Sequence, residues 1–118
     1  MSKNLLLHNP RCSKSRAALA LLQERHVEFE VVPYLEAPPT PARLRDLLRK
    51  LGIGARDLLR TGEAEYAALG LADPTLDDEA IIRAMAAHPR LIERPVFVRD
   101  GRAVIGRPPE RVLDLLPA

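Results

Sequence analysis

The sequence predicts an α/β protein, and three observations support that prediction. Short apolar or β-branched runs occur near both ends of the chain, at 4–8, 27–34 and 94–106. Segments rich in helix formers lie between these runs and fill the middle of the chain. With 118 residues, 47% of them hydrophobic, the chain is long enough and apolar enough for one domain with its own core.

The first third of the chain is typical of a β-α-β unit. The run NLLLH (4–8) is apolar and is followed by Asn-Pro, which indicates a buried strand that ends in a turn. Residues 13–26 are mostly helix formers and carry an apolar stripe. Residues 27–34 begin with alternating apolar and acidic side chains and include β-branched ones. We expect a second strand there that ends at Pro33.

The middle of the chain predicts helices alone. After a Pro-rich link, Thr40 can cap a helix that has a proline in its first turn, and Gly52 ends that helix. Residues 54–62 and 63–71 predict two short helices. Residues 73–89 predict a longer one, with acidic residues early and a proline at its end.

The last part of the chain returns to strand periodicity. Two β runs flank Asp100 and Gly101 within residues 94–106, and this dipeptide strongly favours a hairpin. Residues 107–116 begin with prolines suited to a first helical turn, so we expect a helix there.

The predicted order is β-α-β, a helical block, and then β-β-α. Without the block, this is the layout of a thioredoxin-like fold. We therefore expect a single domain over residues 1–118, built around a mixed four-stranded sheet. Its core would be formed by 1–36 and 91–118, with an all-helical insertion at about 40–90.

Composition excludes several classes of function. The net charge is only +2, and no basic stripe interleaved with aromatic residues occurs, so we expect no nucleic-acid partner. No apolar run approaches 18 residues, and the N-terminal apolar run is too short for a secretory signal. Three scattered histidines and one cysteine lack metal-ligand spacing and allow no internal disulfide. We expect a cytoplasmic monomer with no metal and no membrane partner.

The one cysteine, Cys12, opens the predicted helix at 13–26 in the stretch LLLHNPRCSKSRAALALL. A helix N-terminus supplies unpaired N–H groups and partial positive charge. Nearby side chains add cationic charge or hydroxyl donors: Arg11, Lys14, Arg16, Ser13 and Ser15. Such surroundings stabilise a thiolate, so we predict a reactive thiol rather than an inert buried one.

The residues around Cys12 argue against two common classes of thiol site, a Cys-x-x-Cys redox pair and a tyrosine-phosphatase loop. His8, at the end of the first predicted strand, can support the loop by a hydrogen bond or a positive charge, or can be a solvated strand-end residue. A Cys-x-x-Cys redox pair is absent because position 15 is Ser15. A tyrosine-phosphatase loop needs Arg where this chain has Ala18.

The loop HNPRCSKSR (8–16) resembles the active-site loop of the glutaredoxin-coupled arsenate reductases, His-Asn-Pro-x-Cys-x-x-Ser-Arg. Residues 94–116 resemble the C-terminal hairpin and helix of that family, and the resemblance covers nearly the whole chain. It implies a thioredoxin-like fold in which Pro95 resembles the cis-proline that faces the cysteine.

The resemblance also implies the chemistry. Cys12 would attack arsenate while Arg60, Arg94 and Arg107 hold the oxyanion. Glutathione would act as co-substrate on the thiol–arsenate adduct, and glutaredoxin would then remove the glutathione; no bound cofactor is implied. Where the characterised reductases have Ala, Gly and Thr, this chain has Arg11, Ser13 and Lys14. The added cations would favour a different anion or the carboxylates of glutathione.

Two further functions stay open at this point. One is a glutathione-dependent thiol or disulfide reductase on the same fold. The other is a non-enzymatic redox regulator that binds RNA polymerase, although such regulators usually carry the Cys-x-x-Cys pair that Ser15 removes.

Overall fold

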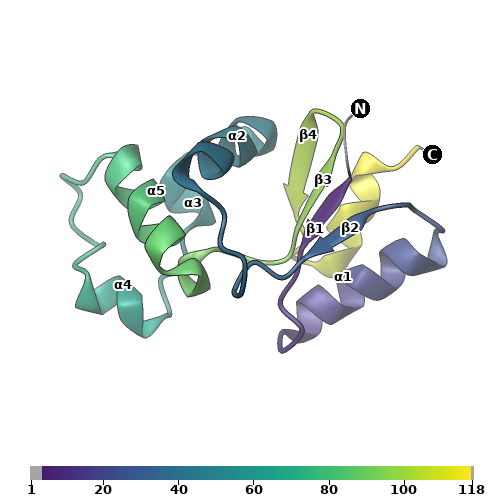
Figure 1. Ribbon diagram of the computed structural model, residues 1–118, viewed down its shortest axis with the longest axis horizontal. Helices are drawn as coiled ribbons and strands as arrows, with labels where there is room; N and C mark the ends of the chain where they lie inside the picture. The colour runs from purple at the N-terminus through teal and green to yellow at the C-terminus, as the bar shows by residue number, and fades with distance from the viewer. Residues whose placement is uncertain (1–3, 118) are drawn as a thin grey trace. The chain divides into compact units, whose positions relative to one another are not determined.

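The chain forms two units in the computed structural model, which describes residues 4–117 (Figure 1). The two ends of the chain make the first unit, and Pro38–Glu93 makes the second. The outermost positions of the predicted domain, 1–3 and 118, lie outside the described residues.

A mixed four-stranded sheet organises the first unit. Strand β1 (Leu5–Leu7) pairs in parallel with β2 (Glu30–Val32) and antiparallel with β3 (Val96–Arg99). Strand β4 (Arg102–Ile105) pairs antiparallel with β3, which gives the order β2-β1-β3-β4. The predicted α/β class and mixed four-stranded sheet are therefore confirmed.

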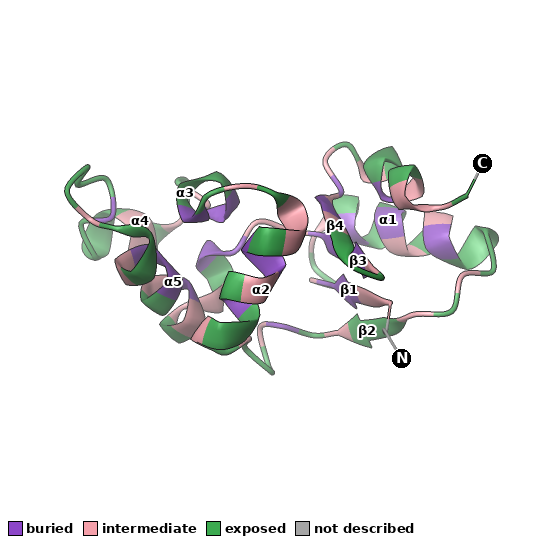
Figure 2. Ribbon diagram, turned by 90° about the horizontal axis from the view of Figure 1, so that it is seen from above, coloured by how far each residue is buried: buried purple, intermediate pink, exposed green. Residues whose placement is uncertain are grey.

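The core of this unit lies between the sheet, α1 (Ser13–Glu24) and the 3₁₀ helix η2 (Pro109–Leu115), which pack against each other (Figure 1). Figure 2 shows the buried stripe of α1, which includes Ala18 and Leu22. Phe97 of β3 is fully buried. The buried cluster contains six residues: Leu6, Ala18, Leu22, Phe97, Val104 and Val112.

Two predicted elements differ in extent or kind from those observed. The helix expected at 107–116 is the 3₁₀ helix η2, with the tight bonds Arg111 N to Pro108 O and Leu116 N to Leu113 O. The strand expected at 27–34 is shortened to β2. At its start the chain turns at His26, at φ 55°, and Val27 N still donates to Leu22 O of α1.

The second unit is helical and consists of α2 (Pro41–Leu51), α3 (Ala55–Leu58), α4 (Ala64–Ala68), α5 (Asp78–Ala87) and the 3₁₀ helix η1 (Pro89–Leu91). As predicted, the Thr40 hydroxyl caps α2 by accepting from Arg43 N, and Gly52 ends it at φ 69°. Helix α5 begins at 78 rather than 73, because Asp77 caps it by accepting from Ala80 N. No helix within residues 4–117 has the length and apolar character needed to cross a membrane.

A close backbone approach joins the two ends of the β3–β4 hairpin. Gly106 N donates to Pro95 O at 2.8 Å, and both Arg94–Pro95 and Arg107–Pro108 are cis peptides. A Cβ atom on Gly106 would lie 2.8 Å from Pro95 Cγ and 3.1 Å from Val112 Cγ1. Only glycine therefore fits at position 106 without displacing its neighbours.

Candidate active site

The loop between β1 and α1 delivers Cys12 to the N-cap of the helix. Asn9 shapes this loop: its side-chain oxygen accepts from Arg11 N, and its carbonyl accepts from Cys12 N, both at 3.0 Å. Cys12 has extended backbone angles, and its carbonyl accepts the first helical bond, from Arg16 N. Cys12 is thus the partly exposed N-cap residue of α1, and its side chain makes no capping hydrogen bond. A helix N-terminus favours negative charge near it.

A buried hydrogen bond between Ser15 and His8 holds the loop in place. Ser15 is fully buried, and its Oγ lies 2.6 Å from His8 Nδ1, while Asn9 N donates to the same oxygen at 3.0 Å. When His8 carries its proton on Nε2, its Nδ1 accepts the hydroxyl proton of Ser15. The three residues thereby tie the end of β1 to the first turn of α1.

The protonation state of His8 follows from its surroundings. The side chain is only 8% exposed. Burial, and to a smaller extent the charge of Arg16, lowers the pKa of His8 below its ordinary value of 6.5. At neutral pH His8 is therefore neutral, and it supports the loop by hydrogen bonding rather than by positive charge.

This lowered pKa predicts how stability responds to acid. In the unfolded chain His8 regains its ordinary pKa, so on acidification the unfolded state takes up the proton first. We expect the free energy of unfolding to fall as pH drops below about 6.5 and His8→Gln to reduce that fall. Urea unfolding between about pH 7.5 and about pH 5.5 measures both slopes. Equal slopes for the two proteins would contradict the lowered pKa.

The cations of the loop divide into two kinds. Arg16 turns back on the loop, and its Nη1 donates to Pro10 O at 2.8 Å, so its guanidinium braces the backbone next to Cys12. Arg11 and Lys14 are exposed at the rim, on the loop and in the first turn of α1.

Two of the three arginines implied by the resemblance lie at the same end of the sheet as this loop. In the strand register Leu7 is opposite Val96, and Val96 is opposite Ile105. His8 and the loop therefore continue from β1 where Arg94 and Pro95 lead into β3 and Arg107 follows β4. Arg107 Nη1 donates to Arg94 O at 3.2 Å, and the buried Pro95 separates Arg94 from the strand.

The third arginine, Arg60, belongs to the helical unit, where it follows α3. Its backbone N donates to Leu91 O at 2.7 Å. Its guanidinium forms ion pairs with Glu63 (Nη1–Oε1, 3.0 Å) and Glu93 (Nε–Oε1, 3.7 Å). Neither glutamate is among the predicted site residues, and only the three-residue spacing of Arg60 and Glu63 signals the first pair.

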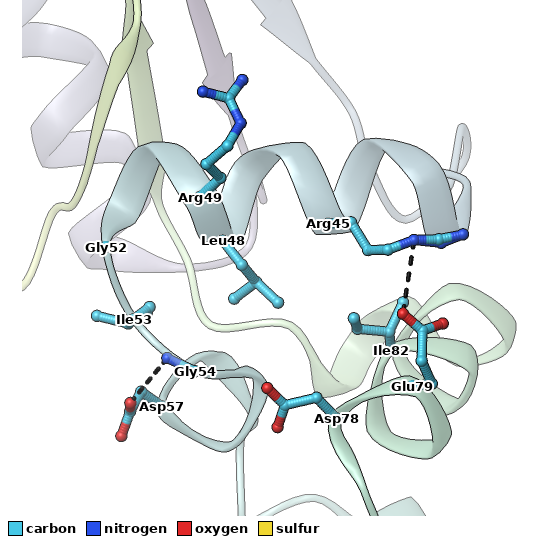
Figure 3. A pocket seen from close by; sticks show the side chains of 10 residues that line it. All are labelled: Arg45, Leu48, Arg49, Gly52, Ile53, Gly54, Asp57, Asp78, Glu79 and Ile82. Atoms are coloured by element: carbon cyan, nitrogen blue, oxygen red, sulfur yellow. Dashed lines mark hydrogen bonds and ion pairs between the residues drawn. The ribbon is translucent and has the colours of Figure 1, made fainter.

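The helical unit also has a hollow of about 550 Å³ between α2, α3 and α5 (Figure 3). Several of its charged side chains have partners: Arg45 Nε lies 3.6 Å from Glu79 Oε1, and Gly54 N donates to Asp57 Oδ2. The residues that line it include none of the predicted site residues: Arg45, Leu48, Arg49, Gly52, Ile53, Gly54, Asp57, Asp78, Glu79 and Ile82. Within residues 4–117, no group of three or more His, Cys, Asp or Glu could hold a metal ion.

Comparison with known proteins agrees with the resemblance carried by the loop. An "Arsenate reductase" of Neisseria meningitidis is 50% identical over 108 residues, 91% of this chain and 92% of that protein. The "Uncharacterized protein YfgD" of Escherichia coli K12 is 55% identical over 112 residues, 94% of each chain. The structure titled "Arsenate reductase from Vibrio cholerae" superposes with a TM-score of 0.94 at 45% identity, over 97% of this chain and 98% of that one. A model of the ArsC family matches residues 7–115. The predicted family is thereby confirmed: the chain belongs to the ArsC family.

Proposed function

We propose that the protein is an arsenate reductase, an oxidoreductase that converts arsenate to arsenite with Cys12 as the nucleophile. One observation carries the proposal. A partly exposed thiol at a helix N-terminus shares one end of the sheet with Arg94 and Arg107. A nucleophile and two arginines therefore lie at one end of the sheet, and attack on a tetrahedral anion uses groups of both kinds. The names of the relatives at 50% and 45% identity support arsenate as the anion.

The proposed reaction balances with two external thiols. The Cys12 thiolate attacks arsenic, an S–As bond forms, and one arsenate oxygen leaves as water after protonation. The thiolate of glutathione then attacks the Cys12 sulfur, and the S–As electron pair stays with arsenic, which leaves as arsenite. Cys12 is now joined to glutathione by a disulfide. A glutaredoxin thiol takes over the glutathione and restores the Cys12 thiol.

The surrounding residues have separate roles in this scheme. Arg94 and Arg107, joined in the proposal by Arg60, donate to the arsenate oxygens through planar forks that suit an oxyanion. Ser15 and His8 hold the loop through the hydrogen bond between Ser15 Oγ and His8 Nδ1. Arg11 and Lys14 offer exposed cations for the carboxylates of glutathione. A thiol that depends on glutathione implies a reducing compartment, so we propose the cytoplasm.

The test is a coupled assay of NADPH consumption with glutathione, glutathione reductase and glutaredoxin. We expect turnover that requires arsenate, stops when glutathione or glutaredoxin is omitted, and yields one arsenite per NADPH. NADPH consumption that is indifferent to arsenate would contradict the proposal.

A second function on the same site is favoured by the exposed cations beside the thiol. Arg11 and Lys14 can attract the carboxylates of glutathione whatever anion Cys12 attacks. A glutathione-dependent thiol or disulfide reductase would turn over a glutathione mixed disulfide in the same assay without arsenate. This result, together with inactivity toward arsenate, would replace the first proposal by the second.

A further inference from the structure

The start of α1 carries cations where a helix usually carries acids. Lys14 and Arg16 lie near this start, Arg11 directly precedes Cys12, and the first turn has no acidic residue. By comparison, α3, α4 and α5 each have an acidic residue in the first turn. Because a helix N-terminus has partial positive charge, the cations at this end of α1 are unfavourable for the helix. The stability of α1 therefore does not explain why they are there.

These cations have no carboxylate partner. Arg11 and Lys14 form no ion pair within residues 4–117. Arg16 donates through Nη1 to Pro10 O, an uncharged acceptor that leaves its positive charge in place. All three side chains are exposed, and together we call Arg11, Lys14 and Arg16 the cationic surface beside Cys12.

The acidic end of α1 is too far away to offset this surface. Within Ser13–Glu24 the only acidic residue is Glu24, the last one. Lys14 and Glu24 are ten residues apart, which corresponds to about 15 Å along the helix axis. At physiological salt, interactions between exposed charges are largely screened beyond about 8 Å. A molecule that approaches the start of α1 therefore meets positive charge on this helix.

The last step of the proposed reaction brings a second protein to Cys12. The glutaredoxin thiolate attacks the glutathione sulfur, a new disulfide joins glutathione to glutaredoxin, and the Cys12 sulfur leaves as a thiolate with the electron pair of the broken bond. Glutaredoxin must contact the surface around Cys12, because the chain has no second thiol that could carry the disulfide elsewhere. Glutathione has one more carboxylate than ammonium groups, so the attached molecule offsets only one of the three cations.

We infer that the cationic surface docks an acidic face of the glutaredoxin, and that Arg11 and Lys14 increase the rate at which the two proteins meet. Opposite charges on two protein surfaces accelerate association, and salt weakens this effect. The inference rests on the proposed function, because it takes glutaredoxin as the reductant of the Cys12–glutathione disulfide. It adds a surface that selects the partner protein by charge.

The test measures how fast reduced glutaredoxin removes glutathione from Cys12. The mixed disulfide is prepared with glutathione disulfide, without arsenate, and the glutaredoxin is one with a net negative charge at neutral pH. Mass spectrometry of acid-quenched samples follows the loss of the glutathione adduct. For the wild type, the second-order rate constant is expected to fall about tenfold between about 20 mM and about 300 mM salt.

Variants of the cationic surface identify the charges that matter. Arg11→Gln and Lys14→Gln should each lower the rate constant at low salt about twofold to fivefold, and the double variant should depend less on salt than the wild type. Arg25→Gln is the matched control. Arg25 is the exposed C-cap residue of α1, so its loss changes the net charge equally but should leave the rate constant unchanged. Equal rate constants in the wild type and the double variant would overturn the inference.

A small thiol separates docking from the reactivity of the disulfide. Dithiothreitol reduces the same mixed disulfide but has no protein surface to dock. Its rate constant should change less than about twofold in Arg11→Gln and Lys14→Gln. If both variants slow dithiothreitol as much as they slow glutaredoxin, the cations act on Cys12 as the leaving group, and the docking surface is disproved.

The outcome can be told apart from the outcome of the arsenate assay. If arsenate is reduced as proposed but glutaredoxin reduces the wild type and the double variant at equal rates, this inference alone fails. If the rates depend on salt and on Arg11 and Lys14 while arsenate is not reduced, the proposed function fails and the docking surface serves the disulfide reductase. If glutaredoxin reduces the mixed disulfide at no salt concentration, this inference and the glutaredoxin step of the proposed function fail together.

Discussion

Cys12→Ser is expected to abolish arsenate-dependent NADPH consumption in the coupled assay. A serine hydroxyl stays protonated at neutral pH and cannot form the S–As bond, and the chain has no second thiol to replace it. Ser13→Ala is the matched control, because Ser13 is the exposed neighbour in the first turn of α1 and should retain activity. Turnover that survives in Cys12→Ser would remove Cys12 from the mechanism.

The same variant also identifies the intermediate. When glutaredoxin is omitted, wild-type protein treated with arsenate and glutathione should carry one glutathione on Cys12, as read by mass spectrometry. Cys12→Ser should carry none. Glutathione attached to the wild type without arsenate would instead support the thiol or disulfide reductase.

Arg107→Ala is expected to lower kcat/KM for arsenate by about 100-fold to 1000-fold, the usual cost of losing one donor to a developing oxyanion. The loss of stability should be small by comparison. The half-buried side chain donates through Nη1 to Arg94 O, and one such bond contributes about 1 kcal/mol to the free energy of unfolding. Kinetics and urea unfolding of the same preparation measure both effects.

Arg102→Ala provides the comparison for Arg107. Arg102 begins β4 and is exposed, so its removal changes the net charge equally but should leave kcat/KM nearly unchanged. Arg107→Lys should recover only part of the activity, because an ammonium cannot reproduce a planar fork. Equal losses in Arg107→Ala and Arg102→Ala would show that Arg107 acts only through overall charge.

The elements were predictable where the pattern that specifies them is local. Thr40 and Gly52 set the ends of α2, and Asp100 with Gly101 sets the hairpin, because each acts on backbone within a few residues. The ends of β2 and α5 were less predictable. Several acidic residues precede α5, and the conformation of the turn decides which of them caps the helix. Asp77, rather than an earlier residue, accepts the N–H of Ala80.

The candidate site follows the same rule: its local features could be predicted from the sequence, and its contacts between distant residues could not. The position of Cys12 at a helix N-terminus follows from the local sequence, since Asn9 and Pro10 end one element just before another begins. The contact of His8 with Ser15 spans seven residues and needs the turn between them. The ion pair of Arg60 with Glu93 depends on the bridge between Leu59 and Ile92, and no pattern of apolar residues in the sequence predicts that bridge.

The residue that stands in place of the second cysteine of a Cys-x-x-Cys pair has a structural role. Ser15, at the position of a second redox cysteine, is fully buried and bonded to His8 and Asn9. It contributes to the shape of the loop, and it offers no sulfur to pair with Cys12. A redox switch within this chain would need a different residue at that position, which weighs against a regulator of RNA polymerase.

The close approach of Gly106 to Pro95 sets a boundary for redesigning this protein. Loop positions 11, 13 and 14 are exposed, so a library aimed at other oxyanions can vary them without disturbing the core. Position 106 offers no such freedom, because any side chain there meets Pro95 and Val112 and would shift the backbone that carries Arg94 and Arg107. Substitutions that change the anion specificity should therefore be made at the exposed loop positions, and Gly106 of the hairpin should be kept.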